Sequence, residues 1–179
     1  MLIETIFTPN EVAAFVELPT KKVYKELEYK ILPASQPLQL PFAALIYLCV
    51  LKDVNFEFSV DSRTRLYQRL VEALEQKEPT IEVGKFFILQ LEFIISELSE
   101  MITRFNAWKN CLVIDPNIMG GETVFPNSRL TVRHIGAMLD RGESLEVIRE
   151  DYPYLSEEDL KFAQIYIKAY PSVGRPRKH

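Results

Sequence analysis

Three helix-start signals follow one another closely in the segment Leu130–Ala163. Thr131, Ser144 and Ser156 can each accept a hydrogen bond from the backbone N–H groups at the start of a helix. Between the first two, Gly142 can end a helix in the left-handed conformation that other residues adopt rarely. The segment therefore predicts three short helices, with Leu145 and Ile148 of the second pointing inward. Such a group is typical of a helix-turn-helix, of a surface that docks another protein, or of a small helical core.

A second pair of short helices is predicted over residues 7–32. Thr8 is a typical helix cap, Pro9 suits the first helical position, and Glu11 can complete a capping box. Pro19 ends this helix because proline disfavours a helical conformation at the residue before it. We expect Thr20 to cap the second helix. Two short helices around a tight turn are the outline of a helix-turn-helix.

The middle of the chain predicts more helix and one hairpin. Helices are expected over 41–52, 60–76 and 94–108, with a hairpin or extended edge over 79–93. The helix over 94–108 can be part of the core or can pair with a second copy of the chain. The predicted fold is mainly α, with a winged or plain helix-turn-helix region over 1–109, a trihelical helix-turn-helix-like domain with a short β-hairpin lead over 110–170, and a basic tail over 171–179.

Composition places the chain among soluble globular proteins, with 47% hydrophobic and 26% charged residues and a net charge of −4. The longest apolar run, FAALIYLCVL, is too short to cross a bilayer, and no secretory signal precedes it. We expect a cytoplasmic protein. With two cysteines and two histidines, and without a phosphate-binding loop or a catalytic triad, we expect no enzyme activity, no cofactor and no metal site.

The second predicted helix of the N-terminal region carries the candidate DNA-binding residues. Its basic and polar positions can contact phosphates, as recognition helices do with their N-terminal residues. The candidates are Thr20, Lys21, Lys22, Tyr24 and Lys25. The alternative is an ordinary solvated face, because Glu26 and Glu28 interrupt the basic stripe.

The C-terminal region resembles the bacterial family named domain of unknown function 433, which has a trihelical, helix-turn-helix-like core. The resemblance departs at Thr123 and at the sequence FPNSR. It rests on Asp115, Pro116, Ile118, Gly120, Gly121, Arg129, Val132, Gly142, Ser144, Asp151, Tyr152, Pro153, Leu155 and Asp159. Members are often encoded beside a PIN-like ribonuclease toxin, and those with an N-terminal helix-turn-helix resemble VapB-type antitoxins. The resemblance thus implies an antitoxin that neutralises its toxin and represses its own operon.

Charge separates the C-terminal helices from the tail. From Arg133 to Lys161 the helices carry four basic against eight acidic residues, an unfavourable balance for a phosphate backbone. We expect them to contact protein, with Arg129 holding the preceding loop and His134 partly buried. The last nine residues carry three basic side chains and no acidic one. The candidate toxin-binding residues are Arg175, Arg177 and Lys178, unless the tail is only a solubilising end.

The sequence predicts, in sum, an antitoxin that binds a PIN-like ribonuclease toxin and operator DNA. A homodimer is expected, because helix-turn-helix proteins commonly read paired half-sites. The alternative function is a stand-alone transcription regulator whose C-terminal domain dimerises.

Overall fold

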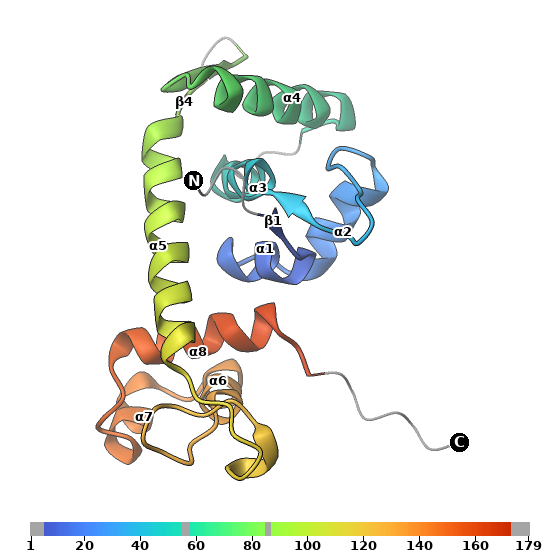
Figure 1. Cartoon of the computed structure of the whole chain (residues 1–179). Coiled ribbons are helices and arrows are strands. Elements are labelled where there is room, and N and C mark those ends of the chain that lie inside the picture. Colours follow the sequence, from blue (N-terminus) through green and yellow to red (C-terminus); the bar gives the residue numbers. More distant parts are fainter. Residues whose placement is uncertain (1–5, 55–57, 85–86, 173–179) are drawn as a thin grey trace. The chain divides into compact units, whose positions relative to one another are not determined.

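The computed structural model describes residues 6–54, 58–84 and 87–172 (Figure 1). These residues are mainly helical and form eight α-helices, which confirms the predicted class. The chain divides into two compact units, Met1–Ile102 and Thr103–His179. The division falls within α5 (Leu91–Cys111), and the predicted boundary between residues 109 and 110 lies in the same helix.

The first two helices of the first unit are α1 (Pro9–Phe15) and α2 (Thr20–Glu28). Thr8 and Glu11 form the predicted capping box on α1. The predicted cap at Thr20 is wrong, because the helix already includes this residue and Pro19 occupies the cap position. Pro19 has an extended backbone, and its carbonyl oxygen accepts the N–H of Lys22 at 2.8 Å. The turn between the helices is therefore tighter than predicted.

Helix α3 (Phe42–Val54) forms the centre of this unit and lies between α1 and α4 (Val60–Gln76), as Figure 1 shows. Its side chains from Phe42 to Leu48 are all buried, as its continuous apolar sequence predicts. Ser59 caps α4 through the N–H of Ser62. Strands β1 (Ile6–Phe7) and β2 (Leu40–Pro41) pair antiparallel and bring the chain into α3.

Strands β3 (Thr80–Val83) and β4 (Phe87–Gln90) form the predicted antiparallel hairpin. Helix α5 follows β4 directly and begins earlier than predicted. The reason is Leu91, which is fully buried and donates its N–H to the carbonyl oxygen of Pro79 at 2.9 Å.

The second unit contains α6 (Val132–Asp140), α7 (Leu145–Asp151) and α8 (Glu157–Ala169). The three predicted capping side chains each accept a backbone N–H. Gly142 has a φ of +85° and ends α6 as predicted. The predicted β-hairpin before α6 is much shorter than expected. Val124 exchanges two hydrogen bonds with Val113 in an isolated bridge, because the connection forms turns and the short 3-10 helix η2 (Met119–Gly121).

Helices α6 and α8 pack very closely at Gly136. A Cβ atom at this position would lie 2.5 Å from Cγ2 of Ile167 and 2.8 Å from the carbonyl oxygen of Ala163. Around this contact lies the core, made of Phe125, Val132, Ile135, Met138, Ile148, Leu155, Leu160 and Ala163. Leu145 was expected to point inward and is 46% exposed instead, because the seven-residue α7 turns only Ile148 fully into the core.

Candidate nucleic-acid interface

Helix α2 carries all five predicted DNA-binding residues. Lys21, Lys22 and Lys25 are exposed, Tyr24 is 44% exposed, and Thr20 is half-buried. Val23 lies on the opposite side and is fully buried. The helix therefore presents the predicted polar set to solvent while its apolar side packs on the rest of the unit.

Glu26 is the exception on α2, because its side chain is buried. The hydroxyl of Tyr47 donates to Oε2 of Glu26 at 2.7 Å, and Arg63 forms an ion pair with Oε1. Burial, together with the hydrogen bond to Glu26, raises the pKa of Tyr47 well above its usual range. Glu26 thus interacts with the interior of the unit and adds no negative charge to the exposed face of α2.

Tyr29 follows α2 and is in contact with two cations. The guanidinium of Arg63 lies 5.1 Å from the centre of the Tyr29 ring, and the ammonium of Lys25 lies 5.7 Å from it. Both distances suit cation–π interactions. The group holds the end of α2 against α4, so the orientation of α2 depends on residues distant in sequence.

Sequence reasoning missed the buried pair of Glu26 and Arg63. One signal for Glu26 was present, since it lies three residues after the apolar Val23 and therefore on the same side of the helix. Arg63 gave no comparable signal, because α4 has three arginines, Arg63, Arg65 and Arg69, and no sequence pattern distinguishes the first from the other two.

Two expectations for the second unit are wrong. Arg129 is exposed, and Ser128 closes the loop instead, with its hydroxyl donating to Phe125 and accepting from Leu130. His134 is exposed because it falls on the outer side of α6, where its ring meets the ring of Tyr152 edge to face. Neither residue therefore has its predicted role.

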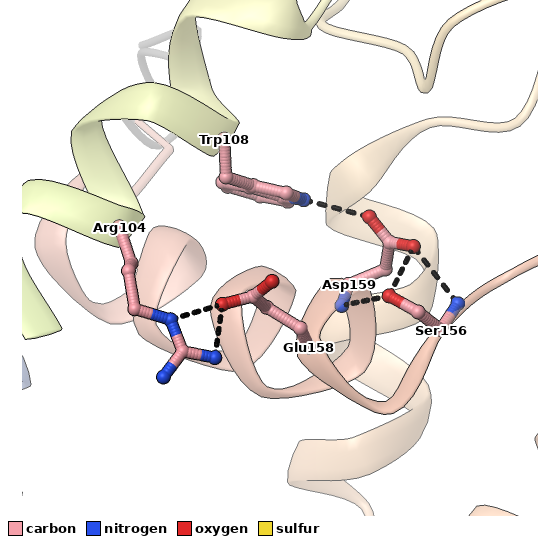
Figure 2. Close-up of polar contacts among 5 residues, drawn as sticks. All are labelled: Arg104, Trp108, Ser156, Glu158 and Asp159. Carbon is pink, nitrogen blue, oxygen red and sulfur yellow. Dashed lines mark hydrogen bonds and ion pairs between the residues drawn. The ribbon is translucent and has the colours of Figure 1, made fainter.

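The end of α5 is joined to the start of α8. Figure 2 shows Asp159, whose carboxylate accepts from the indole Nε1 of Trp108 at 2.8 Å and also completes the capping box with Ser156. Beside it, Arg104 forms an ion pair with Glu158 at 2.7 Å. Trp108 also packs on the core of the second unit. This contact fixes where α8 begins.

The predicted toxin-binding residues Arg175, Arg177 and Lys178 lie outside the described residues. Within the described ranges, no group of three or more histidine, cysteine or acidic side chains is arranged to hold a metal ion. Nor does any helix there combine the length and apolarity needed to cross a membrane.

Comparison with known proteins supports the resemblance of the C-terminal region. Residues 112–167 match the family described as Protein of unknown function (DUF433). The matched residues begin directly after α5 and include α6, α7 and most of α8. Trp108 precedes them, although it packs on the same core.

Two further similarities extend beyond this segment. The uncharacterized protein y4eO of Sinorhizobium fredii (strain NBRC 101917 / NGR234) is 30% identical over 93 residues, which are 52% of this chain. The chain spans 42% of the length of that relative. A crystal structure of Rv2018 from Mycobacterium tuberculosis aligns with 88% of this chain and 96% of its own, at 13% identity and a TM-score of 0.33.

Proposed function

We propose that this chain is a DNA-binding antitoxin that represses its own operon and inhibits a PIN-like ribonuclease toxin. In this proposal, α1 and α2 act as a helix-turn-helix and α2 contacts operator DNA. The DUF433 segment and the basic tail contact the toxin. The resemblance of this segment to a family often encoded beside such toxins supports the second part.

The burial of Glu26 is the observation that carries the DNA-binding part. The argument for an ordinary solvated face was that Glu26 and Glu28 interrupt the basic stripe. Glu26 is buried and paired with Arg63. Helix α2 therefore exposes three lysines and only one carboxylate, that of Glu28. Such a face attracts a phosphate backbone, even though the whole chain carries a net charge of −4.

Exposed apolar side chains around the junction of β4 and α5 support a homodimer. Phe87, Ile88 and Phe93 lie on β4 and the first turn of α5 and are 45%, 61% and 62% exposed. Large apolar side chains exposed in one region of a protein commonly mark an interaction site. Ile88→Glu should therefore convert a dimer into a monomer in sedimentation velocity, whereas the control Ile114→Glu, at a residue 70% exposed in the second unit, should leave the dimer intact. A wild-type monomer would contradict this part.

The DNA-binding part is tested by fluorescence anisotropy with the DNA upstream of the chain's own gene. Lys21→Gln, Lys22→Gln and Lys25→Gln should each weaken binding. Each should also reduce the slope of log K against log salt by about 0.9, the contribution of one lost phosphate contact. The control Lys161→Gln makes the same charge change on α8 of the second unit and should bind like the wild type. A triple lysine variant with unchanged affinity would contradict DNA binding by α2.

The toxin-binding part is tested by co-expression with the neighbouring open reading frame. The chain should co-purify with that protein and relieve its toxicity. Deletion of residues 172–179 should reduce the relief if the tail inhibits. If the neighbour neither co-purifies nor loses toxicity, the antitoxin part is wrong, and a stand-alone regulator remains if the DNA-binding test succeeds.

A further inference from the structure

A cavity of about 440 Å³ lies beside α2 within the first unit. Side chains from α2, α3 and α4 form its walls, together with the turn before α2 and the segment before α4. The lining residues are Leu18, Lys22, Lys25, Glu26, Leu48, Leu51, Lys52, Phe58 and Arg63. It is thus large enough for a small organic molecule.

The polar part of this lining is strongly basic. It contains Lys22, Lys25, Lys52 and Arg63 against the single acid Glu26. Both oxygens of Glu26 already accept hydrogen bonds within the protein. Lys52 has an exposed partner outside the cavity, while Lys22 has no ion pair with any described residue. A ligand in this cavity therefore meets uncompensated positive charge.

Arg63 also lines the cavity. Its Nη1 pairs with Glu26, whereas its Nε is buried and has no hydrogen-bond partner among the described residues. A buried N–H without an acceptor is costly and rare in folded proteins. Glu26 therefore satisfies only part of the hydrogen-bonding capacity of this guanidinium.

The remaining lining is apolar, with Leu18, Leu48, Leu51 and Phe58 from three different segments. A phosphate ion or a sugar phosphate would make no apolar contact with this surface. An apolar body that ends in a carboxylate suits both parts of the lining. We propose that the cavity binds an organic carboxylate with an extended apolar body, such as a medium-chain fatty acid.

This ligand would compete with DNA for the same lysines. Lys22 and Lys25 line the cavity and also belong to the proposed DNA-binding face. A bound carboxylate would neutralise positive charge there and weaken phosphate contacts. This coupling rests on the proposed function, whereas binding of the carboxylate does not.

The proposal is tested on the full chain by isothermal titration calorimetry with three probes: octanoate, octan-1-ol and inorganic phosphate. Octanoate should bind, and each of the other two should bind at least about tenfold more weakly, the loss expected for removing a charge-assisted hydrogen bond or the apolar contact. Equal binding of octan-1-ol would show an apolar pocket without anion recognition. Equal binding of phosphate would show a basic surface only. Either result, or the absence of octanoate binding, would overturn the proposal.

Matched variants locate the site. Lys22→Gln and Lys25→Gln should each weaken octanoate binding about tenfold. Lys21→Gln makes the same change one residue away, outside the cavity lining, and should leave octanoate binding unchanged. An equal loss of octanoate affinity in Lys21→Gln would show that binding depends only on the overall positive charge of α2, and it would overturn the proposed site. Because these titrations contain no DNA, their outcome is independent of whether α2 binds an operator.

Discussion

Replacement of Glu26 by alanine should destabilise the first unit severely. The change leaves the guanidinium of Arg63 without its counter-charge and the hydroxyl of Tyr47 without its acceptor. Removal of one partner of a buried ion pair costs about 3–5 kcal/mol, and an orphaned hydroxyl costs about 1–3 kcal/mol. The side chain of Arg63 is 15% exposed and lines an open cavity, so water reaches it and lowers the first cost. We expect a total loss of about 4 kcal/mol.

Two companion variants separate charge from packing. Glu26→Gln keeps an acceptor for Tyr47 and should lose less than half as much stability as Glu26→Ala. The double variant Glu26→Leu with Arg63→Met replaces the pair by apolar side chains and should also be more stable than Glu26→Ala, because no buried charge is left unpaired. Glu28→Ala is the control on the same helix at an exposed position and should change stability by less than about 0.5 kcal/mol.

The assay is urea unfolding followed by two probes. Far-ultraviolet circular dichroism follows the helices of both units, whereas the fluorescence of Trp108, the single tryptophan, follows the second unit. Glu26→Ala should move the circular dichroism transition of the first unit to lower urea and leave the fluorescence transition in place. If Glu26→Ala shifted the midpoint no more than Glu28→Ala, the buried pair would contribute nothing and the reasoning would be refuted.

Three further predictions concern packing and pH. Gly136→Ala should destabilise the second unit by about 1–2 kcal/mol in urea unfolding, because the clash with the backbone of Ala163 outweighs a gain of about 1 kcal/mol in helix propensity; a stabilised variant would contradict the close packing. Trp108→Phe should cost about 1–3 kcal/mol by circular dichroism, since Asp159 loses a donor and the core loses area, and an unchanged midpoint would contradict this. The hydrogen bond from Arg69 lowers the pKa of Glu78, so this pair stabilises the fold at neutral pH and stops doing so as pH falls through that lowered pKa. Replacing Arg69 by glutamine should flatten the melting temperature against pH in this acid range, and an unchanged profile would refute it.

Local capping patterns predicted the starts of most helices. The predicted capping residues Thr8, Thr131, Ser144 and Ser156 each accept a backbone N–H three residues away, so the necessary information lies within one turn. The hairpin over β3 and β4 was equally local. The prediction that Thr20 caps α2 was wrong, because the preceding Pro19 already supplies the extended residue that a cap position requires.

The environment of the candidate site was less predictable, because it depends on contacts between distant residues. The partners of Glu26 lie 21 and 37 positions away, at Tyr47 and Arg63. Their pairing decides which charges α2 shows to solvent, although the lysines themselves were identified from sequence. The predicted burial of His134 and Leu145 was wrong for a related reason. A short helix has several partly polar faces, and only its packing partner determines which of them is buried.

The position of Trp108 has a consequence for the smallest fragment that can fold as the second unit. The matched family segment starts at residue 112, after Trp108 and Phe105, yet both aromatic rings pack against Phe162 of α8. A fragment that begins at Leu112 would leave that ring without these two partners and Asp159 without its indole donor. We therefore expect autonomous folding to require the last two turns of α5. A chain that acquires the family segment by recombination must also supply aromatic side chains that pack on Phe162.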